Sequence, residues 1–214
     1  MKKYTSILPI TLIIISILIS CKKSDTPKDY GVSIKDKTWW GTLTYNSQKT
    51  EYYSVHFNAD KSLVWSQLSG DYPGLWAIRD KQLTMTFPAL GSEIRGDISD
   101  NDLLMNISDN NASVIINSGK LISNPNILLD NTVWNGTADV TKSIDFKLSF
   151  NSGTKVTINW DNSIIHTYSY KRSEYGATFR AIMESEVCFG VITSDKEIKG
   201  SFKDSSTPWA TTKQ

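Results

Sequence analysis

The sequence predicts an all-β protein with two tandem antiparallel domains, each a meander that closes into a barrel or packs as two sheets. Three observations support this fold class. Apolar and polar residues alternate in short segments, turn-forming residues separate those segments, and the second half of the chain repeats the pattern of the first. No segment after residue 21 shows a long helical period.

The amino-terminal segment has the pattern of an export signal. Lys2 and Lys3 precede an apolar run over residues 7–19. A basic region followed by roughly 7–15 apolar residues is typical of a secretory signal peptide. The run is shorter than the about 20 residues that a membrane-spanning helix needs. The sequence therefore predicts a signal peptide over residues 1–20.

The residues before Cys21 resemble the lipobox of bacterial lipoproteins. In that motif an aliphatic residue stands three positions before the cysteine and a small residue directly before it, as Leu18 and Ser20 do here. The resemblance implies a diacylglyceryl thioether on Cys21, cleavage before it, and acylation of the new amine by a fatty acid such as palmitate. The expected partner is a membrane, to which this covalent lipid anchors the protein. No other cofactor is expected.

The localisation expected from the lipobox is the outer membrane, on either its periplasmic or its outer face. The two residues after Cys21 are lysines. An aspartate directly after the cysteine retains lipoproteins at the inner membrane in some bacteria, and none stands there.

The charge and cysteine content exclude two classes of interaction. Without residues 1–20, Lys+Arg falls from 23 to 21 while Asp+Glu stays at 22, so the formal charge is −1. A nearly neutral chain has no overall field that attracts nucleic acid. Once Cys21 carries lipid, Cys188 is the remaining cysteine, so we expect no intrachain disulfide.

The chain after the signal divides into a tether and two domains. Residues 21–33 combine the lipidated cysteine with a polar segment, which we interpret as a flexible tether. The first β domain is expected over residues 34–123 and the second over residues 127–214. Pro and Asn between them interrupt strand pairing.

Alternating residues predict the strands within each domain. Examples cover residues 83–87 in the first domain and residues 144–150 and 198–203 in the second. Each domain has seven or eight candidate strands. Turns are expected where Asn, Asp, Gly and Pro gather, at residues 58–61, 71–74, 100–102, 151–153 and 194–196.

An internal repeat relates the two domains. The matched pairs are Trp39 with Trp134, Trp65 with Trp160, and Gly96 with Gly190. Their order is kept over about 85 residues, which predicts a tandem duplication. The paired tryptophans are expected to fill equivalent core positions.

The first strand of each repeat resembles the calycin group, which includes the lipocalins and avidins. Those proteins carry Gly-x-Trp, whereas the order here is reversed, as Trp-Trp-Gly at 39–41 and Trp-Asn-Gly at 134–136. The resemblance implies lipocalin-like β-barrels more than it implies a ligand.

The residues suited to chemistry do not form a catalytic or metal-binding constellation in the sequence. His56 and His166 occupy different places in the two repeats and have no metal-ligand spacing. Cys188 stands between two apolar residues, so we expect a buried, inert thiol. The acidic segment 97–102 lacks the glycine and closing glutamate of a calcium loop and is expected to be a hairpin turn. We therefore expect neither an enzyme nor a metal site.

Three tryptophans without a tryptophan counterpart are the candidate ligand-binding residues. Trp40, Trp76 and Trp209 lie near turns or the carboxyl terminus, where an aromatic ring can stack on a sugar or an apolar molecule, or pack in the core. The sequence thus favours a non-enzymatic binding module for a small apolar or glycan-like ligand. The alternative is a structural or accessory envelope lipoprotein that binds a protein partner. A ligand barrel hides apolar area in a cavity, whereas an interaction module exposes it as a patch.

Overall fold

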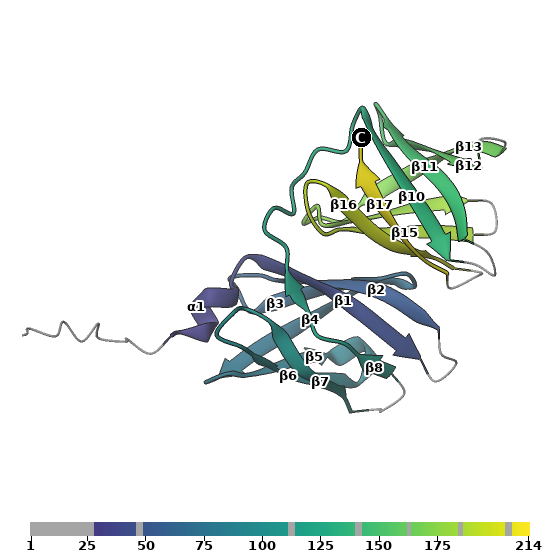
Figure 1. Ribbon diagram of the computed structural model, residues 1–214. Helices are drawn as coiled ribbons and strands as arrows, with labels where there is room; N and C mark the ends of the chain where they lie inside the picture. Colours follow the sequence, from purple (N-terminus) through teal and green to yellow (C-terminus); the bar gives the residue numbers. More distant parts are fainter. Residues whose placement is uncertain are drawn as a thin grey trace, which may run out of the picture.

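The computed structural model describes residues 28–45, 49–110, 114–139, 143–161, 164–183, 186–203 and 207–214. The predicted signal peptide, Cys21 and the first part of the predicted tether lie outside these residues. The described chain forms two antiparallel sheets, one after the other along the sequence (Figure 1). The predicted all-β, two-barrel fold class is confirmed. Among the described residues, no helix has the length and apolar character needed to cross a membrane.

The first barrel is a nearly closed sheet in the order β7-β6-β5-β4-β3-β2-β1-β8, with β9 also paired to β1. A bridge between Leu104 and Gly119 joins its two edges. Its elements are α1 (Tyr30–Ile34), β1 (Lys37–Tyr45), β2 (Thr50–Phe57), β3 (Ser62–Gln67), β4 (Gly70–Arg79), β5 (Gln82–Phe87), the 3-10 helix η1 (Pro88–Leu90), β6 (Ser92–Ile98), β7 (Leu104–Asp109), β8 (Val114–Ile116) and β9 (Lys120–Leu121).

The second barrel is a closed up-and-down barrel in which every strand pairs with its sequence neighbours and the last strand pairs with the first. Its strands are β10 (Thr132–Asp139), β11 (Ser143–Asn151), β12 (Lys155–Trp160), β13 (Ile164–Arg172), β14 (Thr178–Met183), β15 (Glu186–Ile192), β16 (Glu197–Phe202) and β17 (Thr207–Lys213). Full closure leaves this barrel without a free sheet edge.

The predicted equivalence of Trp39 and Trp134 agrees with the strand pairing. Trp39 lies opposite Val55 and Trp134 opposite Leu148, each on the first strand of its barrel. Both tryptophans are fully buried. They therefore form the same layer of the two barrel cores.

The predicted equivalence of Trp65 and Trp160 is wrong by two residues. In the first barrel Val55 pairs with Trp65, whereas in the second Leu148 pairs with Ile158. Trp160 lies two residues further along its strand, one layer closer to the barrel end. It is only half-buried, while Trp65 is buried.

One predicted turn is part of a strand instead. Residues 71–74 lie in β4, where Pro73 pairs with Val64 of β3. The pairs between β4 and β5 begin further along, at Leu75. A proline is tolerated at Pro73 because β4 has a single neighbour there, so no ladder needs the missing N–H.

The helix α1 closes one end of the first barrel. Asp29 caps the helix by accepting a hydrogen bond from the amide of Val32 at 3.2 Å. Tyr30 and Ile34 are buried in the first core cluster. The prediction of a flexible tether is therefore wrong for residues 28–33, which belong to the folded barrel.

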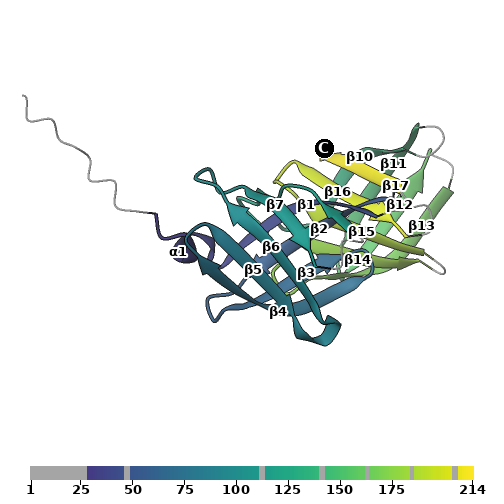
Figure 2. The same cartoon turned by 90° about the horizontal axis from the view of Figure 1, so that it is seen from below.

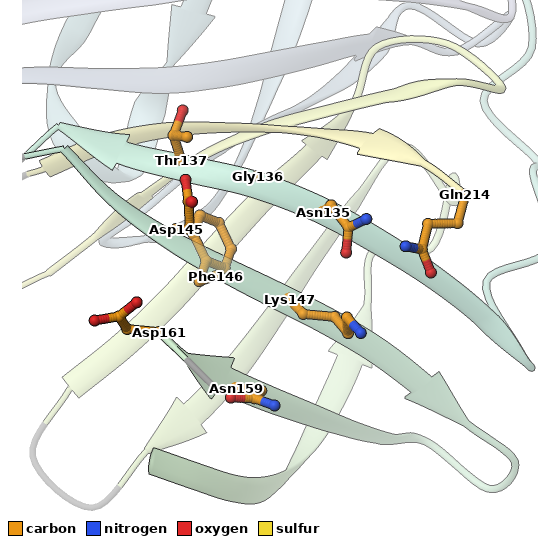
Figure 3. Close-up of a pocket in the computed structure, with 9 residues that line it drawn as sticks. All are labelled: Asn135, Gly136, Thr137, Asp145, Phe146, Lys147, Asn159, Asp161 and Gln214. Carbon is orange, nitrogen blue, oxygen red and sulfur yellow. The ribbon is translucent and has the colours of Figure 1, made fainter. Parts of the chain in front are cut away.

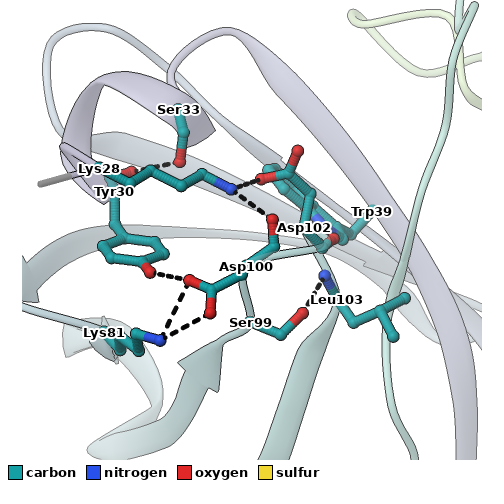
Figure 4. Close-up of polar contacts among 9 residues, drawn as sticks. All are labelled: Lys28, Tyr30, Ser33, Trp39, Lys81, Ser99, Asp100, Asp102 and Leu103. Atoms are coloured by element: carbon teal, nitrogen blue, oxygen red, sulfur yellow. Dashed lines mark hydrogen bonds and ion pairs between the residues drawn. The ribbon is translucent and has the colours of Figure 1, made fainter. Parts of the chain in front are cut away.

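Polar contacts fasten the segment around α1 to the turns at the same barrel end (Figure 4). The Tyr30 hydroxyl donates a hydrogen bond to the carboxylate of Asp100, and Lys81 forms an ion pair with that carboxylate at 3.0 Å. Lys28 forms an ion pair with Asp102 at 2.7 Å. The acidic segment expected to be a hairpin turn is the β6–β7 turn, and two of its carboxylates hold the amino-terminal segment.

The two barrels pack against each other through their outer faces. Figures 1 and 2 show β1 and β2 of the first barrel beside the second barrel. Phe189 and Val191 alternate along β15 with Cys188 and Gly190, which face the core of the second barrel. Phe189 and Val191 therefore point out of this barrel, yet both are fully buried. The interface cluster consists of Leu68, Ile122, Ala177, Phe189 and Val191, with Trp40, Tyr52 and Val187 packed against it.

Polar contacts surround this interface cluster. Arg180 donates hydrogen bonds to the carbonyl of Gln67 at 2.6 Å and to the carboxylate of Asp71 at 2.8 Å. The ring of His56 stacks on Tyr175 with centroids 3.9 Å apart. Burial lowers the pKa of His56. These contacts add hydrogen bonds and ring stacking to the apolar interface.

Candidate functional site

A cavity of about 310 Å³ opens at the end of the first barrel that lies opposite α1. Its residues come from the end of β1, β3, β5 and β7, the start of β4 and β6, and from η1 and β8. The volume is within the range of about 300–1,000 Å³ that is typical of small-molecule sites. The apolar walls consist of Leu43, Trp65, Phe87, Leu90, Ile94, Val114 and Ile116.

Hydrogen bonds hold the polar rim of this cavity in place. The indole Nε1 of Trp65 donates to Oε1 of Gln67 at 2.8 Å, and Nε2 of Gln67 donates to the hydroxyl of Tyr45 at 3.1 Å. Across the cavity, the hydroxyl of Ser92 donates to Asp109 at 3.1 Å. The polar rim consists of Tyr45, Gln67, Tyr72, Ser92 and Asp109.

Glu51 is an acid on the inner face of the barrel beside this cavity. It lies two and four residues before Tyr53 and Val55, which are fully buried in the first core cluster, so the three share the inner face of β2. Glu51 pairs with Leu43, which lines the cavity. Burial, together with the charge of Glu51, raises the pKa of Tyr45 to about 12.

The carboxylate of Glu51 has an unused hydrogen-bonding oxygen. Its Oε2 is buried and has no hydrogen-bond partner among the described residues. Burial raises the pKa of Glu51, an effect that the charge of Lys49 partly offsets. A buried acceptor without a partner costs free energy, so this position is unfavourable for folding alone.

One layer close to this barrel end, that of Leu43, differs between the two barrels. In the first barrel, Leu43 of β1 pairs with Glu51 on one side and with Ile116 on the other. In the second barrel, the equivalent residue is Ala138 of β10, which pairs with Ile144 and with Trp209. The second barrel thus has apolar side chains, one of them a large ring, where the first has an acid and a smaller side chain.

Aromatic rings fill the corresponding interior of the second barrel. The ring centroid of Trp160 lies 5.3 Å from that of Phe146 and 5.0 Å from that of Phe202, and Phe202 lies 5.9 Å from Trp209. Gln67 of the first barrel stands in the position that Trp160 takes in the second. The same topology therefore has a hollow end in one barrel and an aromatic plug in the other.

A second hollow, of about 490 Å³, lies along the outside of the second barrel (Figure 3). It runs across β10, β11 and β12, with Asp145, Lys147, Asn159 and Asp161 among its lining residues. Most of these side chains are exposed or half-buried and polar. This groove therefore has a mostly polar lining, unlike the apolar walls of the cavity in the first barrel.

The expectation that Trp76 and Trp209 are available to a ligand is wrong. Their exposed fractions are 3% and 2%. The indole of Trp76 donates to the carbonyl of Asn58 at 3.0 Å, and the ammonium of Lys61 lies over its ring at 3.7 Å. Trp209 lies in the core of the second barrel. Both are packing residues.

Trp40 belongs to the interface between the barrels. It is half-buried and packs against the interface cluster, with its ring centroid 6.2 Å from that of Tyr52. The ammonium groups of Lys199 and Lys120 lie 5.1 Å and 5.8 Å from its ring centroid. The structure does not bring the three predicted tryptophans together in one site.

The other residues singled out from the sequence have separate places. His56 lies at the barrel interface, whereas His166 is exposed on β13. Cys188 is fully buried, as predicted. Among the residues that the structure describes, no three His, Cys, Asp or Glu side chains are grouped closely enough to hold a metal ion.

The sequence interpretation missed Glu51 and Gln67, although a signal for Glu51 exists. Glu51 begins an inward-facing series that continues with Tyr53, Val55 and Phe57, so the alternation of β2 places an acid on its inner side. Comparison of the repeats with the correct register shows Ile144 in the same position. An acid that interrupts an apolar face in one repeat alone points to a role other than packing.

The comparisons with known proteins add no family to these observations. The chain matches neither a protein-family model nor a curated protein.

Proposed function

We propose that the protein is a non-enzymatic, lipid-anchored binding module whose first barrel takes up a small apolar ligand. The single observation that carries this proposal is the apolar cavity of about 310 Å³ at the end of the first barrel. Its floor includes the buried rings of Trp65 and Phe87. Apolar walls with a few fixed polar groups are the usual composition of a small-molecule site.

The contrast between the two barrels supports assigning binding to the first one. An interior that serves stability alone is best filled, because voids lose packing contacts. The second barrel is filled in this way by Trp160 and Trp209. The first barrel keeps Gln67 and Ile116 at the equivalent positions. A ligand that enters this cavity would regain the apolar contacts that the smaller side chains forgo.

The apolar walls favour an apolar ligand over a glycan. A sugar needs many hydrogen-bonding groups, which the polar groove on the second barrel has in greater number. The exposed large apolar side chains do not favour the alternative of a protein partner. Those that the structure describes lie on separate elements or, in the case of Leu128, in the connection between β9 and β10. They are Val32, Leu75, Leu90, Ile115, Leu128, Ile165 and Ile182.

A plugged cavity tests the binding function. Ile116→Trp copies the tryptophan of the second barrel into the cavity and should abolish uptake of the neutral fluorescent probe phenylnaphthylamine. Ile115→Trp is the matched control, because Ile115 on the same strand is 65% exposed and does not line the cavity. Fluorescence titration measures both. Undiminished uptake by the Ile116 variant would contradict the assignment of the cavity.

The anchor is proposed from the lipobox resemblance and has its own test. Cys21→Ala should remove the lipid and leave unprocessed precursor, since the thiol is the acceptor of the diacylglyceryl group. Metabolic labelling with a radioactive fatty acid measures this. Cys188→Ala is the matched control and should retain the label, because Cys188 is fully buried. Label that persists in the Cys21 variant excludes the lipobox.

A further inference from the structure

The cavity of the first barrel has an acidic border. Asp109 is the charged residue among those that line it, and Glu51 lies beside it in the same layer as Leu43. No Lys, Arg or His is among the described residues that line the cavity. Lys49 acts on Glu51 electrostatically, but its side chain is exposed. A ligand in the cavity therefore meets negative charge at the rim.

Glu51 differs from its polar neighbours in hydrogen bonding. Gln67 uses both ends of its amide, accepting from Trp65 and donating to Tyr45 and Ser69. Oε2 of Glu51 is buried and has no partner among the described residues. Beside the cavity, the described chain thus has one carboxylate oxygen that none of its own donors satisfies.

The second barrel shows that the fold does not need this acid. Its equivalent residue is Ile144, which continues the apolar inner face of β11. A buried carboxylate is retained at a cost when it has a partner to bind. No donor for Oε2 of Glu51 is found among the described residues.

We propose that Glu51 selects apolar molecules that end in a cationic amine. The inference rests on the proposed function of the same cavity. An ammonium group offers donors and a positive charge, and hydrogen bonds between ionised groups are stronger than those between neutral ones. The apolar part of the ligand packs against Trp65 and Ile116 while the amine lies at the rim. A carboxylate head group would meet the acids and is rejected.

A matched series of head groups tests this preference. The purified protein, residues 22–214, is titrated calorimetrically at neutral pH with octylamine, octanol and octanoate, which share one apolar chain. A hydrogen bond to a charged group corresponds to about a ten- to hundredfold change in affinity. We expect octylamine to bind more tightly than octanol by that factor, and octanoate to bind most weakly.

Two variants separate the role of Glu51 from general charge effects. Glu51→Gln keeps the shape and should remove the preference for octylamine over octanol. Glu174→Gln removes the same charge at an exposed site in the second barrel and should leave the preference intact. Equal binding of octylamine and octanol, or a preference that survives in the Glu51 variant, overturns the inference. Binding of none of the three ligands overturns the proposed function as well.

Discussion

At the scale of single residues, Glu51 is where the first barrel departs from the requirements of folding. Its neighbours on the inner face of β2 are fully buried apolar or aromatic residues. Burial penalises the charged form, which is why the pKa of Glu51 is raised. Sites adapted to bind a ligand often carry such a local cost.

The raised pKa of Glu51 predicts a stability change of definite sign. Between its ordinary pKa and its raised pKa, the folded protein binds more protons than the unfolded chain, so stability falls as pH rises through this window. The penalty is fully present once the pH exceeds the raised pKa. Glu51→Gln should therefore raise the melting temperature at neutral pH, and the gain should vanish as pH falls below the ordinary glutamate pKa.

Thermal unfolding followed by circular dichroism across this pH range measures the effect. Glu174→Gln serves again as the control and should leave the melting temperature nearly unchanged, since surface substitutions usually have small effects. A lower melting temperature for the Glu51 variant at neutral pH would mean that the carboxylate stabilises the fold.

At the scale of elements, α1 is a structural plug for the closed end of the first barrel. Ile34 contributes most to this role because it is fully buried. The ion pairs around it are partly exposed, with side-chain exposures of 53% and 72% for Lys81 and Asp100. Exposed pairs of this kind contribute little stability. The helix is held mainly by its apolar face.

The packing of α1 can be measured by a pair of substitutions on one helix. Ile34→Ala should lower the free energy of unfolding by about 2–5 kcal/mol, because it removes buried methyl groups and leaves a cavity. Val32→Ala changes a side chain that is 63% exposed and should stay within about 0.5 kcal/mol. Urea titration compares them. Equal losses would show that α1 is held by other contacts.

The elements also show which parts of the structure a sequence can predict. The alternation of apolar and polar residues correctly predicted the inward-facing side of the strands and the repeated β pattern, because side chains on a strand alternate between its two faces. It failed to fix the register between Trp65 and Trp160, because a slip of two residues keeps each side chain on the same face. The pattern is unchanged by such a slip, and only the strand pairing removes it.

The candidate site was less predictable than the fold for a related reason. Unpaired tryptophans drew attention to Trp76 and Trp209, which are core residues. The cavity arises instead from residues that are smaller than the residues at the equivalent positions of the second barrel. Ile116, for example, stands where the second barrel has Trp209. A cavity forms where side chains from several strands together leave space unfilled. It therefore cannot be predicted from any single segment of the sequence.

At the scale of the whole molecule, the outer faces of the two barrels form one buried interface. Arg180 connects it to Gln67 and Asp71 of the first barrel. Although partial burial alone would raise the pKa of Asp71, hydrogen bonds from Arg180 and Ser66 hold it below its ordinary value. The Arg180 contacts therefore stabilise the ionised carboxylate at neutral pH.

Removal of Arg180 should weaken this interface. Arg180→Ala is expected to lower the free energy of unfolding by about 1–3 kcal/mol, since hydrogen bonds of a charged group are lost at a partly buried site. Arg95→Ala is the control: it breaks a pair with Glu93 in which the arginine is 64% exposed, and should cost less than about 1 kcal/mol. Denaturant titration compares the two, and an equally small loss for Arg180 would show that apolar packing alone joins the barrels.

The position of α1 determines from which side a ligand arrives. The chain enters the first barrel at α1, while the cavity opens at the other end of β1. Six residues, 22–27, separate Cys21 from the folded segment, and they span at most about 25 Å. With the proposed lipid on Cys21, the closed end stays near the bilayer and the opening faces the aqueous phase. On these two proposals, of the lipid anchor and of the binding cavity, the protein would collect molecules that have already left the membrane and would not extract them from it.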